Sequence, residues 1–170
     1  MVLFDAGILI KLLDPRTPIA ERDKLDYLVA CLQKAGTKII IPTPALSEFY
    51  VKADPDVLAP IKGRAAFIIV PFDEKAAFEC ALNVRSALGT GKKRGVQTDA
   101  SWQKIKFDHQ IVAIAKVNGA HTIYSEDGGL RRFASSLGLA VLCTDDLADN
   151  PGSKQQKLDL TPDDDTGNPA

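Results

Sequence analysis

The hydrophobic positions of this chain fall into short continuous runs that alternate with longer stretches of helical spacing. The runs are three to five residues long and rich in β-branched side chains, which is typical of strands buried on both faces. Between the runs, apolar residues recur three and four positions apart, and this spacing predicts amphipathic helices. The predicted strands span residues 2–4, 38–41, 66–70, 121–124 and 139–142.

Small and polar residues mark where the helices begin and end. Thr43-Pro44 predicts a capped helix start, Asp73 caps the helix after the third strand, and Gly36 and Gly119 end helices. The alternation of strands and helices predicts an α/β fold, with a parallel sheet covered by helices on both faces. In such sheets, ligands bind beyond the carboxyl ends of the strands. The predicted helices span residues 8–13, 21–34, 43–53, 55–63, 73–88, 105–118 and 130–137.

Two segments depart from this alternation. Residues 89–104 are polar and lack periodicity, which predicts a long loop of the kind that often carries function. Residues 149–170 predict an acidic, disordered tail behind a single domain at residues 1–148. Residues 144–170 carry seven Asp and two Lys, so the net charge of −1 conceals a net charge of +4 on the rest of the chain.

The composition indicates where the protein works. Hydrophobic residues make up 45% of the chain and charged residues 25%, as in ordinary globular domains. The three cysteines, Cys31, Cys80 and Cys143, are far apart and form no C-x-x-C motif, which argues against a disulfide framework or a zinc site. Asp5 interrupts the first apolar stretch too early for a signal peptide, and no run approaches the roughly 18 apolar residues of a membrane span. We therefore expect a cytoplasmic protein with no membrane attachment.

Four acidic residues lie where the predicted fold places ligands. Asp5 closes the first strand, Asp127 follows the fourth, and Glu48 and Asp108 lie on predicted helices. Asp108 heads an apolar stripe with members at i+3, i+4 and i+7, so its carboxylate should face the sheet and need a partner or a metal. Each acid also has a purely structural explanation. Asp5 and Asp108 could cap helices, Asp127 could serve a turn before two glycines, and Glu48 could pair with a lysine four positions later.

Taken together, the four acids predict a metal site. Carboxylates gathered at one edge of a sheet repel each other unless a cation lies among them. Mg²⁺ takes oxygen ligands, and two such ions can hold the attacking and leaving oxygens when a phosphodiester is cleaved. Trp102 could stack on an unpaired base or simply anchor its segment. Basic residues near the acids would bind a polyanionic substrate; they are Lys92, Lys93, Arg94, Lys104, Lys106 and Arg131.

Four short motifs along the chain resemble those of the PIN domain, the nuclease fold that includes the VapC-like toxins of bacterial toxin–antitoxin pairs. They are FDAGILI with Asp5, PTPALSEF with Glu48, DHQIVAIA with Asp108, and SED with Ser125 and Asp127. The resemblance covers residues 2–145 and implies a three-layer α/β/α sandwich around a five-stranded parallel sheet. It also implies Mg²⁺- or Mn²⁺-dependent cleavage of single-stranded RNA, with the four acids as metal ligands and Ser125 hydrogen-bonded near the first acid. The partners it implies are an RNA substrate, an antitoxin that covers the acidic groove, and a second copy in a homodimer.

The chain departs from this family pattern at Gly7, where the family has Asn, Ser or Thr two residues after the first acid. The departure removes a side chain that helps to order the metal site. His109 is expected on the surface, because a residue next to Asp108 points away from that acid's side of the helix. A haloacid dehalogenase-type phosphatase would need a second acid at position 7, and a phospho-receiver domain would need an acidic pair near the first strand. The alternative to a nuclease is a non-catalytic PIN-like module that binds RNA or protein, and the four clustered acids argue against it.

Overall fold

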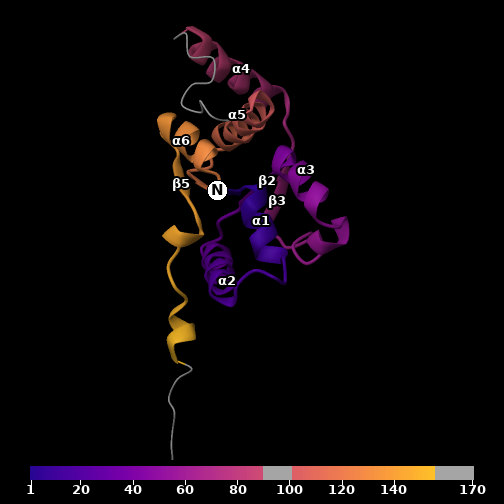
Figure 1. The fold of residues 1–170 in the computed structure, drawn as a ribbon, viewed down its shortest axis with the longest axis vertical. Coiled ribbons are helices and arrows are strands. Elements are labelled where there is room, and N and C mark those ends of the chain that lie inside the picture. Colours follow the sequence, from indigo (N-terminus) through magenta and orange to yellow (C-terminus); the bar gives the residue numbers. More distant parts are fainter. Residues whose placement is uncertain (90–100, 156–170) are drawn as a thin grey trace, which may run out of the picture.

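The computed structural model describes residues 1–89 and 101–155, and a five-stranded parallel sheet forms its centre (Figure 1). Each predicted strand is confirmed, with boundaries within one residue. The strands are β1 (Val2–Phe4), β2 (Ile39–Pro42), β3 (Phe67–Val70), β4 (Thr122–Tyr124) and β5 (Ala140–Leu142). Six α-helices lie in the described ranges: α1 (Ala6–Leu13), α2 (Ile19–Lys34), α3 (Thr43–Lys52), α4 (Glu74–Gly89), α5 (Trp102–Val117) and α6 (Gly128–Ser136). Short 3-10 turns are η1 (Pro55–Leu58), η2 (Thr144–Asp146) and η3 (Pro151–Gln155), so the helix predicted at 55–63 is reduced to η1.

Strand β1 lies in the middle of the sheet, whose order is β3-β2-β1-β4-β5. Leu3 pairs with Ile40 on one side and with Ile123 on the other. The chain builds β2 and β3 outward on one side of β1 and then crosses over to build β4 and β5 on the other. The direction of winding therefore reverses between β1 and β4. In open parallel sheets such a reversal leaves a crevice at the carboxyl ends of the two strands, where ligands bind.

Two hydrophobic cores cover the two faces of the sheet. Successive side chains of β1 point to opposite faces, so Leu3 enters one core while Val2 and Phe4 enter the other. Helices α1, α2 and α3 contribute to the core that contains Phe4, and α5 and α6 contribute to the core that contains Leu3. This arrangement confirms the three-layer α/β/α sandwich. It also places the ends of β1 and β4 between packed helices.

Helix α4 lies outside α5 instead of on the sheet (Figure 1). Its contact with the core is made through Ala76, which is fully buried. Phe78 and Leu82, on the apolar side of α4, are 67% and 44% exposed. Helix α5 is consequently enclosed between the sheet on one side and α4 on another.

Helix α5 begins inside the segment predicted to be a loop. The side chain of Ser101 accepts a hydrogen bond from the backbone N–H of Lys104 at 3.3 Å, and this cap starts the helix at Trp102. The loop prediction was therefore wrong for residues 102–104, while residues 90–100 lie outside the described part of the chain. The predicted cap at Thr43 was also wrong. Thr43 is the first residue of α3, and its hydroxyl accepts a hydrogen bond from the backbone N–H of Phe72 at 3.2 Å.

The first residues of the predicted tail contact α2. Asp149 lies 3.6 Å from the ammonium of Lys24, and the amide of Asn150 donates a hydrogen bond of 2.9 Å to Asp23. Residues 156–170 lie outside the described part, so disorder of the tail stays a prediction. Within residues 1–89 and 101–155, no helix combines the length and the apolar character that a membrane crossing requires.

Candidate active site

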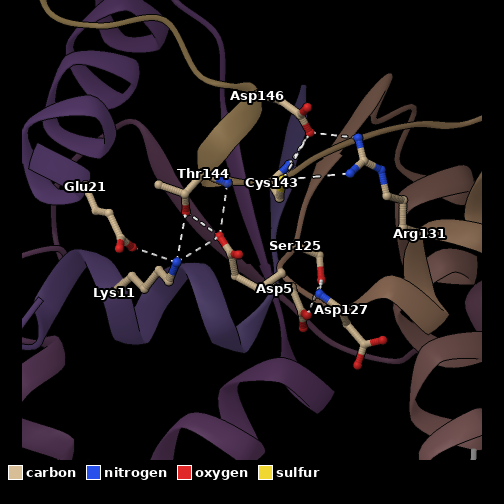
Figure 2. Close-up of polar contacts among 10 residues, drawn as sticks. Asp5, Lys11, Glu21, Ser125, Asp127, Arg131, Cys143, Thr144 and Asp146 are labelled. Atoms are coloured by element: carbon tan, nitrogen blue, oxygen red, sulfur yellow. Dashed lines mark hydrogen bonds and ion pairs between the residues drawn. The ribbon is translucent and has the colours of Figure 1, made fainter. Parts of the chain in front are cut away.

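The candidate site lies where the strand order reverses, at the carboxyl ends of β1 and β4. Asp5 directly follows β1, and Ser125 directly follows β4. The Ser125 hydroxyl donates a hydrogen bond of 2.7 Å to Oδ2 of Asp5, and the backbone N–H of Asp127 donates one of 3.0 Å to Oγ of Ser125 (Figure 2). The backbone N–H of Asp5 also donates to the carbonyl of Tyr124 at 3.0 Å. These bonds hold the predicted residues Asp5, Ser125 and Asp127 together across the crevice.

Asp5 combines the two roles that its sequence position suggested. Its Oδ1 accepts a hydrogen bond of 2.7 Å from the backbone N–H of Ala6 and caps α1, while its Oδ2 faces Ser125. The residue is only 7% exposed. Burial raises the pKa of Asp5 above its usual value, although the hydrogen bonds from Ser125 and Ala6 favour the ionised form. The ionised form of Asp5 is therefore disfavoured by its burial, and a nearby cation would stabilise it.

Asp127 caps helix α6 and also faces the site. Its Oδ1 accepts hydrogen bonds from the backbone N–H groups of Gly129 at 2.6 Å and Leu130 at 3.1 Å. Its Oδ2 forms an ion pair with the ammonium of Lys104. Burial alone would raise the pKa of Asp127, but the Lys104 ion pair and the two backbone donors outweigh it and lower the pKa. Asp127 is thus the best-stabilised of the site's carboxylates for which a pKa shift is resolved.

Glu48 and Asp108, the other two predicted acids, lie on helices α3 and α5. Asp108 is 5% exposed and heads the apolar stripe of α5 as predicted, with Ile111 buried one turn later. Glu48 is half-buried on α3. The pKa of Glu48 is raised first by burial and then by repulsion from Asp5 and Asp127, against the attraction of Lys52 four residues later. The repulsion shows that Glu48 lies within electrostatic reach of both acids at the strand ends.

A lysine lies among these acids. The ammonium of Lys104 pairs with Asp127, and this bond, together with attraction to Asp127, Asp108 and Glu48, raises the pKa of Lys104. Lys104 also acts on Asp5, lowering the pKa of that carboxyl against the effect of burial. Lys104 is therefore paired with Asp127 and lies within electrostatic reach of Asp5, Glu48 and Asp108.

The donor set has the chemistry of a site for a hard divalent ion. It offers carboxylate oxygens from four residues and a neighbouring hydroxyl, the ligands that Mg²⁺ and Mn²⁺ prefer. In the part of the chain that the structure describes, however, no three His, Cys, Asp or Glu side chains form a group that could hold a metal ion. The ammonium of Lys104 pairs with Asp127 instead, so a bound metal would require these side chains to rearrange.

Solved structures of similar fold include VapBC2 from Rickettsia felis bound to a DNA fragment from their promoter, with a TM-score of 0.60 and 16% identity over 84% of this chain and 98% of that chain. DNA-bound VapBC from Salmonella typhimurium gives a TM-score of 0.54 and 16% identity over 85% of this chain and 99% of that chain. The chain has the PIN-domain fold. No protein-family model matches the sequence, and no curated protein matches it either. At these identities the likeness establishes the fold alone, and the chemistry of the chain has to be argued from its own residues.

Of the basic residues predicted to bind substrate, Lys104, Lys106 and Arg131 lie in the described part of the chain. Lys104 lies among the acids, and Lys106 places its ammonium 5.8 Å from the ring centroid of Trp102. The guanidinium of Arg131 is held by Asp146 at 2.7 Å (Figure 2). Lys92, Lys93 and Arg94 lie outside the described residues.

His109 is not on the surface, and that prediction was wrong. The residue is 5% exposed, and its ring stacks on Phe133 of α6 with centroids 4.0 Å apart. The sheet, α6 and α4 all pack against α5. More of its surface is therefore buried than the apolar stripe headed by Asp108. The apolar residues at i−4 and i+4 from His109, Ile105 and Ala113, carried this signal in the sequence. Burial lowers the pKa of His109, so this imidazole is kept neutral.

Sequence reasoning also missed a polar network beside the candidate site. Glu126 accepts a hydrogen bond of 3.0 Å from the backbone N–H of Thr144, and its carboxylate lies 3.4 Å from the ammonium of Lys11. The same ammonium lies 2.7 Å from Glu21 of α2 (Figure 2). This network connects α1, α2, the end of β4 and η2. No pattern in the sequence indicates it, because its members are brought together only by the crossover connections.

Proposed function

We propose that this protein is a metal-dependent endoribonuclease that cleaves single-stranded RNA, with Mg²⁺ or Mn²⁺ as its cofactor. The observation that supports the proposal is the connection of Asp5 and Asp127 through Ser125 at the ends of β1 and β4. Glu48 lies within electrostatic reach of both of these acids, and Lys104 is attracted to Asp127, Asp108 and Glu48. A protein gains no stability from clustering four acids, since two of them have raised pKa values. Such a cluster is a common sign of a functional site.

In this proposal the four acids hold the metal, and each element of the site has a task. A bound ion of this kind lowers the pKa of a coordinated water and offsets charge that develops on the phosphate. Ser125 fixes the orientation of Asp5 through the 2.7 Å hydrogen bond, and the cap on α6 fixes Asp127. Lys104, at the rim of the same crevice, is positioned to contact a phosphate of the RNA backbone. The packed helices on both faces keep the carboxylates from relaxing into solvent.

Incubation of the purified protein with single-stranded RNA in Mg²⁺, in Mn²⁺ and in EDTA tests this proposal. Cleavage should appear with either metal and stop in EDTA, and Asp108→Asn should abolish it. Asp26→Asn, which removes a carboxylate from the exposed side of α2, serves as the matched control and should cleave like the wild type. Cleavage of equal rate in EDTA would contradict a metal-dependent reaction.

We further propose that the protein is the toxin of a toxin–antitoxin pair and acts in the cytoplasm, where it also dimerises. The support is the fold shared with VapBC structures bound to DNA. Induced expression in a bacterial host should arrest growth, and co-expression of the protein encoded beside it should relieve the arrest. A chain carrying Asp5→Asn should not arrest growth. Arrest by this variant would contradict a toxic activity that depends on the acid cluster.

A non-catalytic PIN-like binding module is the second candidate. It is favoured by one observation, the position of Lys104 among the acids where no three described side chains form a metal-binding group. Calorimetric titration with Mn²⁺ separates the two functions. The nuclease should bind Mn²⁺, while a module should show no binding at millimolar concentration.

A further inference from the structure

We infer that helix α4 is the surface through which two copies of this chain form a symmetric dimer, with the two α4 helices packed antiparallel. The inference rests on the dimer that the proposed function includes, and it names the residues that form the interface. Three features of α4 carry it. Both sides of the helix are apolar, the outer side faces solvent, and the outer side is complementary to a second copy of itself.

The inner side of α4 packs on the rest of the protein. Ala76 is fully buried, and Glu79 forms an ion pair with Lys116 of α5. Cys80 and Asn83, which follow on the same side of the helix, are partly buried. These contacts attach α4 to α5 through one side only. A helix attached in this way ordinarily presents polar residues on its opposite side.

The outer side of α4 is apolar instead. Phe78 is 67% exposed and Leu82 is 44% exposed. Ala77 and Ala81 are exposed beside them, and spacings of three and four positions place all of these residues on one side of the helix. Figure 1 shows α4 at the outer edge of the molecule, beyond α5. A contiguous apolar patch at such a position indicates a surface that binds a partner.

This outer side matches an inverted copy of itself. Consider two α4 helices packed antiparallel, with a two-fold axis between them at the level of positions 79 and 80. Phe78 of each copy then faces the partner's Ala81, and Leu82 faces the partner's Ala77. Each large side chain meets a small one, so the helices can approach closely and leave no void between them. A two-fold interface requires this self-complementarity, which points to a second copy of the chain as the partner.

The charges on α4 follow the same symmetry. Glu74 and Arg85 are exposed and lie on the outer side of the helix, about three turns apart. In the antiparallel pair, Glu74 of each copy faces the partner's Arg85, so an ion pair borders the apolar contact at each end. A parallel pair would instead place equal charges opposite each other, and these would repel. Size and charge therefore favour the same antiparallel register.

Sedimentation of the purified full-length protein over a range of concentrations tests the apolar part of the interface. Phe78→Asp and Leu82→Asp each place a charge inside the proposed contact. Val51→Asp is the matched control, because Val51 is an 83% exposed valine on another helix, α3. The circular dichroism spectrum of each variant should match that of the wild type, since all three positions are exposed in the single chain.

The wild type should dimerise with a Kd on the order of 10 µM, as expected for a small interface. Phe78→Asp and Leu82→Asp should each raise this Kd at least about 100-fold, because a buried charge would lie against an apolar partner. Val51→Asp should leave the Kd unchanged.

Reversal of the charges tests the register. Glu74→Arg and Arg85→Glu should each raise the Kd about ten-fold, because each creates two pairs of like charges across the two-fold axis. The double variant should return the Kd to within about two-fold of the wild-type value, since the ion pairs form again with their signs exchanged. A double variant as weak as the single ones would show that the antiparallel register is wrong.

Two further outcomes would overturn the inference, and both can be told apart from failure of the nuclease, which the RNA cleavage assay measures separately. If the protein dimerises and neither Phe78→Asp nor Leu82→Asp weakens the dimer, another surface forms it, and the proposed dimer stands without α4. If the wild type stays monomeric at a concentration about ten times the expected Kd, the α4 interface and the proposed dimer fail together.

Discussion

The hydroxyl of Ser125 donates a 2.7 Å hydrogen bond to Oδ2 of Asp5, joining residues that are 120 positions apart in the chain. Both residues are buried, with exposures of 1% and 7%. The bond spans the ends of β1 and β4 at the point where the strand order reverses. It therefore sets the orientation of the first acid of the site and ties the site to the packing of the central strands.

Removing this hydroxyl should loosen the site and shift its titration. Ser125→Ala is expected to lose about 1–2 kcal/mol of unfolding free energy, because two buried hydrogen-bonded groups lose their partner. The Ser125 hydrogen bond lowers the pKa of Asp5, so without it that pKa rises further and ionised Asp5 is lost at a higher pH. The acid limb of the pH–activity profile should accordingly move to higher pH. Urea unfolding and a pH–rate series measure the two effects.

The conservative variant separates these effects from a general disturbance of β4. Ser125→Thr keeps the hydroxyl and should keep the acid limb where the wild type has it, even if the added methyl group costs some stability in the buried site. An unshifted acid limb in Ser125→Ala would show that the hydroxyl does not act on Asp5.

Neutralising Asp5 should separate activity from stability. Asp5→Asn is expected to lower cleavage at least about 100-fold by removing one of the proposed metal ligands, while Asn still caps α1. The pKa of Asp5 is raised by burial, so the wild-type carboxylate destabilises the folded state at every pH above that raised value. At pH 7 the free energy of unfolding of the variant should therefore equal that of the wild type or exceed it by about 1 kcal/mol. This difference should disappear at a pH low enough to protonate Asp5 in the wild type. A variant that is less stable at pH 7 but still cleaves RNA would refute both expectations.

The strands of the sheet could be predicted from the sequence because the hydrophobic pattern of each strand is local. Continuous runs such as residues 2–4 and 38–41 are buried on both faces, so they need no tertiary information to be recognised as strands. The acids could be grouped for a related reason, since the carboxyl ends of parallel strands meet at one edge. Asp5 shows the limit of this reasoning. Its position fitted a cap and a site residue equally well, and the structure assigns one carboxylate oxygen to each.

What the sequence could not show depends on which elements lie against each other. His109 is buried because α6 and α4 both pack on α5, and the apolar Ile105 and Ala113 on the same side of α5 indicate a buried side without showing what covers it. Phe78 is exposed for the converse reason, because α4 packs on a helix and not on the sheet. Lys104 was assigned to a basic loop for binding substrate, and the cap at Ser101 places it on a helix that turns it toward the acids.

The network around Glu126 should make stability depend on acidity. Burial raises the pKa of Glu126, but hydrogen bonds from Thr144 and the charge of Lys11 outweigh it and lower the pKa below the usual 4.5. A lowered carboxyl pKa adds stability that is fully present above pH 4.5 and is lost as the pH falls through the folded-state value. Glu126→Gln should therefore cost about 1 kcal/mol at pH 7 and very little near pH 3. Urea unfolding at the two pH values measures the difference.

A double-mutant cycle identifies the partner of Glu126. With Lys11→Met as the second change, the coupling energy should be positive at pH 7 and fall at low pH. Lys116→Met, which removes a lysine that pairs with Glu79 far from this network, should show no coupling with Glu126→Gln. A coupling energy that is independent of pH would show that the charge of Glu126 is not what stabilises the network.

Gly7 marks the departure of this chain from the family pattern, and the structure has room to reverse it. A Cβ atom at Gly7 would meet Cβ and Cγ of Glu126 at 3.6 and 3.7 Å, which is ordinary contact, and the backbone there is helical. Gly7→Ala should therefore stabilise α1 by about 0.5–1 kcal/mol without changing metal binding. Gly7→Ser should gain less stability, but it adds a hydroxyl two residues after Asp5 and should tighten Mn²⁺ binding relative to Gly7→Ala. Calorimetry on the two variants isolates the hydroxyl from the helix propensity, and equal Mn²⁺ affinities would mean that the missing side chain does not limit this site.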